Sequence, residues 1–219
     1  MAGLKRQYVA IAILICVAAA WLFASAARSR DRAIEAGFWF DEVTFEDSQP
    51  MAERLGGPIA PLEMQTIEAI AKQEVSSAFT SFRVSVTDNR NAQYRVRVVQ
   101  QLYHPLSWRI PGPSGESRST PGIGGRGAVN FAILANQAVA YAPAGLDRPG
   151  MLAAIGRGIG RAAVHEFAHQ FLGSWPIHDS TDVRSFEYRS ADRPAQFYGE
   201  MHWDIAQPVL RQRFGRASN

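Results

Sequence analysis

Hydrophobic and polar positions follow two different rhythms along the chain, which predicts a domain that contains both helices and strands. In residues 61–79, apolar side chains recur every three or four positions, and this spacing predicts an amphipathic helix. In residues 82–86 and 94–98, apolar and polar side chains alternate, which predicts two strands paired around a turn at 88–91. Residues 33–58 predict a strand or an extended lead-in.

The second half of the chain predicts a loop, one or two strands and a long helix. Residues 111–127 are rich in Gly, Pro and Ser and predict a loop. Ala128–Tyr141 is apolar enough for one or two strands. Met151–Leu172 predicts the longest helix of the body, and Gly173 is typical of a helix end.

Three glycines interrupt that long helix, at positions 156, 158 and 160. Each costs roughly 1 kcal/mol relative to alanine in a helix, so packing must compensate, and we expect a neighbouring strand to approach closely there. A loop-rich stretch follows as far as Trp203. A short final helix is predicted next, with Asp204 as its N-cap and Pro208 in its first turn. These elements predict the α+β class.

The first 32 residues form a separate region. Residues 8–27 are twenty consecutive uncharged positions, about the length that an α-helix needs to cross a ~30 Å hydrocarbon layer. Lys5 and Arg6 before this run and small residues at its end are typical of a signal peptide, whereas the run's length and the arginines that follow it favour an uncleaved single-pass anchor. Positive charge flanks both ends of the run and leaves the orientation of an anchor open. We expect residues 33–219 to lie outside the cytoplasm, membrane-anchored or secreted, and in the periplasm of a bacterial cell.

Length, charge and cysteine content limit the kinds of domain and binding partner that the chain can have. A chain of 219 residues fits one domain of ordinary size. The chain has a net charge of +3, of which residues 1–32 contribute +4 and residues 33–219 contribute −1. Because the body is not basic, we expect no nucleic-acid partner. The single cysteine, Cys16, lies in the N-terminal apolar run, so the body has no thiol for a disulfide or a metal.

The motif His165-Glu166-Phe167-Ala168-His169 falls within the predicted long helix. Side chains four residues apart project from one face of a helix, so His165 and His169 can occupy two corners of a tetrahedral zinc site. Glu166 lies beside them and can act as a general base toward water that Zn²⁺ has acidified. The sequence therefore predicts a zinc-dependent hydrolase.

A catalytic zinc site needs a third protein ligand. His178 is the expected one, because a turn at Gly173 can bring it back over the helix and because three of the five histidines fall within fourteen residues. Other downstream donors remain open as the third ligand. They are Asp179, Glu187, Glu200 and His202.

The motif, the glycine after it and the pair His178-Asp179 resemble the zincin metallopeptidases, and within them the metzincins. The spacing differs, because Gly173 and His178 lie four and nine residues after His169, where metzincins have three and six. The resemblance implies a mixed β-sheet, a long active-site helix, a C-terminal helix and a peptide or protein substrate.

The resemblance also implies roles for residues outside the motif. Met201 would form a methionine turn beneath the metal, although core filling explains it equally well. Tyr188, with Tyr198 as the alternative, would donate a hydrogen bond to the oxyanion. Ala128–Tyr141 would supply an edge strand that pairs with an extended substrate, and a covered core strand is the alternative.

Two other functions fit the sequence. One is a zincin-like module that has lost its activity and acts as an interaction protein in the cell envelope. The other is a zinc amidase with a non-peptide substrate. Metal content separates the first from a peptidase, and cleavage profiling separates the second.

Overall fold

The structure is a computed structural model that describes residues 33–41, 45, 47–104, 107–120, 123–173 and 177–215. The predicted signal peptide or anchor in residues 1–32 lies outside the described residues. None of the helices within those ranges combines the length and the apolar character needed to cross a bilayer. Residues Ile34–Asn219 form one compact unit, which contains both a sheet and helices.

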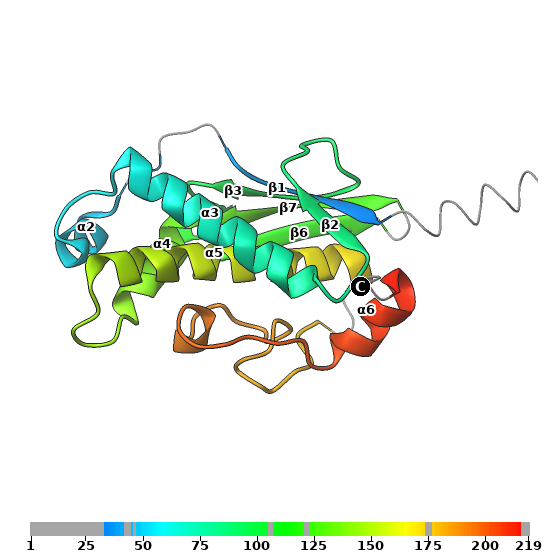
Figure 1. The fold of residues 1–219 in the computed structure, drawn as a ribbon. Helices are drawn as coiled ribbons and strands as arrows, with labels where there is room; N and C mark the ends of the chain where they lie inside the picture. Colours follow the sequence, from blue (N-terminus) through cyan, green and yellow to red (C-terminus); the bar gives the residue numbers. More distant parts are fainter. Residues whose placement is uncertain are drawn as a thin grey trace, which may run out of the picture. The chain divides into compact units, whose positions relative to one another are not determined.

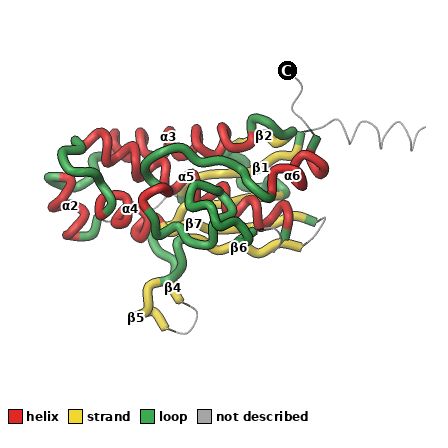
Figure 2. The backbone as a smooth tube through the Cα atoms, turned by 90° about the horizontal axis from the view of Figure 1, so that it is seen from below, coloured by secondary structure: helices red, strands yellow, loops and turns green. Residues whose placement is uncertain are grey.

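The sheet of this unit has five strands in the order β2-β1-β3-β7-β6 (Figure 1). The strands are β1 (Ile34–Phe40), β2 (Val84–Thr87), β3 (Tyr94–Val99), β6 (Gly115–Thr120) and β7 (Gly124–Asn130). All neighbours are parallel except β6, which is antiparallel to β7 and lies at the edge. The α+β class and the mixed sheet are therefore present. A separate two-stranded piece, β4 (Tyr103–His104) and β5 (Ser107–Pro111), projects from the body (Figure 2).

The helices of the unit supply most of its core. They are α2 (Gln49–Leu55), α3 (Pro61–Phe79), α4 (Phe131–Ala140), α5 (Arg148–Leu172) and α6 (Ala206–Phe214). The periodic stretch 61–79 is helical over its whole length, as predicted. The long helix also exists, and it begins three residues earlier than expected because the Asp147 side chain accepts a hydrogen bond from the Gly150 amide. Helix α2 was not predicted.

Strands β2 and β3 exist but do not pair with each other. Strand β1 lies between them and is parallel to both, so the predicted hairpin around 88–91 is wrong. The connection instead crosses over β1 at Gly37, where a Cβ atom would lie 2.2 Å from the Asn89 carbonyl oxygen. The Glu35 carboxylate fastens this crossing by accepting hydrogen bonds from the side chains of Thr87 and Asn89.

The stretch predicted to be a loop, 111–127, contains β6 and the first half of β7. The next stretch, Ala128–Tyr141, was predicted to be strands and is mostly helix α4, which Asn130 caps by accepting a hydrogen bond from the Ile133 amide. Strand β7 is internal to the sheet, so residues 128–130 fit the alternative of a covered strand and not the substrate-pairing edge. The edges of the sheet are β6, which lies next to β7, and β2.

Glycines let α5 pack closely on its neighbours. A Cβ atom at Gly156 or Gly160 would lie 2.8 Å or 2.6 Å from a backbone oxygen of α3, and one at Gly158 would meet the Phe197 ring. The expected close neighbour was a strand, and the actual neighbours are a helix and an aromatic ring. A helix backbone can approach this closely only where side chains are missing.

The start of the final helix is stabilised by a different residue from the one predicted. The Asp204 side chain accepts a hydrogen bond from Ser180 and does not cap α6. The buried Glu187 carboxylate accepts hydrogen bonds from the amides of Asp204 and Ala206 instead, at 3.1 Å and 2.6 Å. Pro208 lies in the first turn, as predicted.

Candidate metal site

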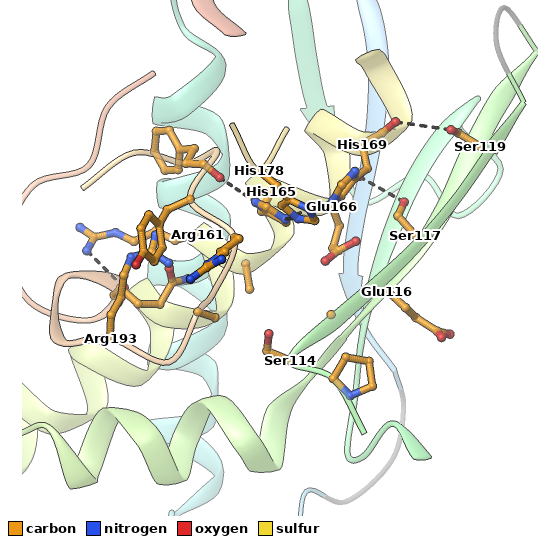
Figure 3. A pocket seen from close by; sticks show the side chains of 18 of the residues that line it. Ser114, Glu116, Ser117, Ser119, Arg161, His165, Glu166, His169, His178 and Arg193 are labelled. Carbon is orange, nitrogen blue, oxygen red and sulfur yellow. Dashed lines mark hydrogen bonds between the residues drawn. The ribbon is translucent and has the colours of Figure 1, made fainter. Parts of the chain in front are cut away.

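The three histidines singled out in the sequence lie together on the C-terminal half of α5 and the loop after it (Figure 3). The Nε2 atom of His165 is 3.0 Å from that of His178 and 3.2 Å from that of His169. Four ligands around zinc at 2.0–2.1 Å lie about 3.3 Å from one another. The three imidazoles could therefore hold a metal ion with little rearrangement.

Backbone carbonyls orient the rings. The Phe186 carbonyl oxygen is 2.7 Å from Nδ1 of His165, which places the proton on Nδ1 and leaves the Nε2 lone pair free. The Gly173 carbonyl oxygen stands 3.4 Å from Nδ1 of His169. Such outer hydrogen bonds are typical of metal-binding histidines.

Burial favours the neutral form of the His165 and His169 rings. It is the main cause that lowers the pKa of His165 to about 3, and the nearby charges of His169, His178 and Arg193 lower it further. Burial also lowers the pKa of His169, and the charge of His178 adds to this effect. Because only a neutral imidazole can bind a metal, the surroundings favour the binding form.

His178 reaches the site through an unusual backbone conformation. Its φ is 82°, in the left-handed region, and it is the one described residue other than glycine with a positive φ. Its amide donates a hydrogen bond of 2.9 Å to the Glu187 carbonyl oxygen. Left-handed backbone at a non-glycine residue persists only where surrounding contacts enforce it, and such residues gather at functional sites.

The alternative third ligands are placed elsewhere. Asp179 and Glu200 are exposed and outside the histidine group. The Glu187 carboxylate is committed to the start of α6. The His202 ring lies 3.2 Å from Asp182, with which it forms an ion pair when protonated.

Glu166 is buried beside the histidines, with 6% of its surface exposed. Burial raises its pKa to about 8, and the charge of Glu116 contributes. None of the described residues donates a hydrogen bond to its carboxylate. A carboxyl group with a pKa close to neutral can both accept and return a proton.

Strand β6 lines the site with small residues. Gly115, Ser117 and Ser119 face α5, and the two serine hydroxyls donate hydrogen bonds to the carbonyls of Glu166 and His169, at 3.2 Å and 3.4 Å (Figure 3). A Cβ atom at Gly115 would lie 2.4 Å from Oε1 of Glu166. Sequence reasoning missed this strand because its inward positions carry no apolar side chain.

A cavity of about 640 Å³ opens over the histidines and Glu166. Such a volume suits a small ligand or a few residues of a peptide. Its walls come from β6, from α5 and from the loop that follows α5. Residues 178–196 of that loop contribute His178, Phe186, Tyr188, Arg189, Ala191, Arg193 and Gln196.

The two tyrosines considered for the oxyanion differ in position. Tyr188 lines the cavity. Tyr198 does not, and its hydroxyl donates a hydrogen bond of 2.7 Å to the Ala138 carbonyl. Met201 packs against the hydrophobic core and is not among the cavity residues.

Comparison with known proteins adds no family. No protein-family model matches the chain, and no curated protein matches it.

Proposed function

We propose that this protein is a zinc-dependent peptidase in which His165, His169 and His178 bind the metal and Glu166 is the general base. The observation that carries the proposal is the convergence of three imidazole Nε2 atoms beside a buried carboxyl group, in a cavity. Zinc is the fitting metal because it is commonly held by three histidines with one position left open.

Each residue has a defined task in this proposal. A bound zinc ion would polarise the scissile carbonyl and acidify water. Glu166 takes the proton from water and delivers it to the leaving amine. Tyr188 stands in the cavity wall, where its hydroxyl can donate to the developing oxyanion.

Strand β6 supports a peptide as the substrate. It lies at the edge of the sheet and lines the cavity, so its outer backbone groups can pair with an extended chain. This edge takes the role that the sequence had given to Ala128–Tyr141. The anchor or signal in residues 1–32 and a place of action outside the cytoplasm remain part of the proposal.

The first test measures metal and hydrolysis together. We expect about one zinc per full-length chain by metal analysis in detergent, with loss of zinc in His165→Ala and His169→Ala. His202→Ala is the matched control, since this histidine is outside the group, and it should keep the metal. The Glu166→Gln variant should retain zinc and lose hydrolysis of a peptide library by at least about a hundredfold.

Two results would overturn the proposal. A folded wild-type protein that binds no zinc would favour the interaction module. Zinc binding with hydrolysis of acyl amides but of no peptide would favour the amidase.

A further inference from the structure

The cavity over the histidines is lined by both carboxyl and guanidinium side chains. The C-terminal half of α5 carries the buried Glu166 next to β6. Arginines line the cavity farther from β6, with Arg161 on the middle of α5 and Arg189 and Arg193 on the loop after it, and two of them are labelled in Figure 3.

All three guanidinium nitrogens of Arg161 donate hydrogen bonds within the protein. Its Nε donates to the Glu74 carboxylate at 2.9 Å, and its Nη atoms donate to carbonyls of residues 195, 196 and 199. It pins the loop to α5, and only 5% of its surface is exposed. Arg161 is thus a structural cation.

Arg193 is also buried, with 7% of its surface exposed, but its bonding is incomplete. Its Nε donates to the Val183 carbonyl at 2.6 Å and its Nη2 to the Ser185 carbonyl at 3.1 Å. Within the described ranges no carboxylate lies at ion-pair distance from this guanidinium, and no acceptor bonds to Nη1. A buried cation without an anionic partner is costly.

Arg193 shares the cavity with the histidines. The guanidinium lies over the Tyr188 ring, 4.8 Å from its centroid, and both residues line the cavity. Burial lowers the pKa of Arg193 to about 10, and the charge of Asp182 acts in the opposite direction.

We propose that Arg193 binds a carboxylate of the substrate, so that preferred peptides carry an acidic side chain or a free C-terminal carboxylate within a residue or two of the scissile bond. The inference rests on the proposed peptidase function. The planar guanidinium with a free Nη1 edge suits a carboxylate, which it can bind with charge-assisted hydrogen bonds.

The test compares matched peptide pools with the wild-type full-length protein. One pair fixes Glu or Gln at each position in turn, and a second pair has a free or an amidated C-terminus. We expect kcat/KM to be about tenfold higher for one acidic pool than for its neutral partner, because a charged hydrogen bond is worth about that factor. The first pair reports a side-chain carboxylate and the second a terminal one.

Variants assign the preference to Arg193. Arg193→Gln should abolish the preference for the acidic pool, and Arg193→Lys should restore part of it, since the charge remains while the fork geometry is lost. Arg184→Gln is the control, because it removes a charge from the same loop at an exposed position that does not line the cavity. If Arg193→Gln does not fold, the wild-type comparison decides alone.

The outcomes separate this inference from the peptidase proposal. Equal cleavage of acidic and neutral pools would overturn the carboxylate site and leave the peptidase intact. If no pool is cleaved, the proposal of a peptidase is overturned. The same pools, now carrying a fluorescent label, are then tested for binding to the Glu166→Gln protein. Tighter binding of an acidic pool would uphold the carboxylate site, and equal or undetectable binding would overturn it.

Discussion

Two consecutive backbone carbonyls hold two of the three histidines. The Phe186 oxygen accepts a hydrogen bond from His165 and the Glu187 oxygen accepts one from His178. One short piece of chain thus sets the tautomer of one ring and the position of another. The backbone at residues 186 and 187 therefore contributes to the arrangement of the histidine group.

Gly115 is a position where a single methyl group should uncouple metal binding from catalysis. In Gly115→Ala the added Cβ would meet Oε1 of Glu166 at 2.4 Å, and a flexible carboxylate can move away at small cost in stability. We expect unchanged zinc content, a Tm within about 3 °C of wild type and at least about tenfold lower kcat. Full activity in this variant would show that the glycine does not set the position of the general base.

At the residue scale, the three histidines and Glu166 could be predicted from the sequence, whereas the residues that surround them could not. His165, His169 and Glu166 carry a motif with a fixed helical spacing, and His178 was expected because histidines cluster in sequence. Gly115 and Arg193 belong to no motif. Their roles follow from which atoms lie next to them in space, and no local pattern carries that information.

At the scale of elements, the contact between α3 and α5 depends on two missing side chains. In Gly160→Ala the Cβ would lie 2.6 Å from the Ala71 carbonyl oxygen, which is rigid backbone, so the helices must separate. The gain in helix propensity is about 1 kcal/mol, and the clash should exceed it, leaving a net destabilisation of about 1–3 kcal/mol. Denaturant unfolding measures the difference.

Ser76→Ala provides the reference for that measurement, since Ser76 is an exposed position of α3. Its unfolding midpoint should stay close to wild type. A Gly160→Ala protein as stable as this reference would mean that the two helices can move apart freely.

The starts of α3 and α5 are joined by an ion pair that predicts a pH dependence of stability. Glu63 accepts hydrogen bonds from Arg148, which is the main cause that lowers its pKa from 4.5 to about 2. A carboxyl group whose pKa is depressed on folding stabilises the fold above its unfolded pKa and loses that effect as the pH falls through its folded pKa. The stabilisation should therefore be full above pH 4.5 and vanish near pH 2.

Thermal unfolding of wild type and Glu63→Gln across this range measures the effect. We expect a Tm gap at pH 6 that narrows between pH 4.5 and 2. A gap that stays constant with pH would assign the difference to packing and not to charge.

Element prediction succeeded where one face of an element is apolar and failed where small residues mediate packing. The helix over 61–79 has regular apolar spacing and was predicted fully. Strand β6 reads as a loop because its inward positions, from Gly115 onward, are small enough to lie against α5. The crossing of the chain over Gly37 also leaves no pattern, since it depends on a contact between distant segments.

At the scale of the whole unit, Glu187 links the candidate metal site to the C-terminal helix. Its carboxylate is fully buried and receives the amides of Asp204 and Ala206 and the Ser185 hydroxyl, while its carbonyl positions His178. In Glu187→Gln an NH₂ group replaces one carboxylate oxygen, so a hydrogen-bond donor would face the N–H and O–H groups that now donate to that oxygen. We expect a destabilisation of about 1–3 kcal/mol and weaker zinc binding.

Denaturant unfolding and zinc titration check both effects in the same protein. Asp204→Asn is a matched control, because it makes the same carboxyl-to-amide change in a neighbouring residue. Within the described part of the chain, the Asp204 side chain accepts a single hydrogen bond, from the Ser180 hydroxyl. If zinc affinity stays at the wild-type value while stability falls, the loop holds His178 without help from Glu187.

The loop from Ile177 to Ile205 has little regular secondary structure, yet it supplies one of the three imidazoles. A bound ion would therefore act as a clasp that ties this irregular segment to α5, and occupancy would stabilise the folded form by mass action. Chelators should then loosen residues 177–205 first, and a protease added to the chelated protein should cut there before it reaches the sheet.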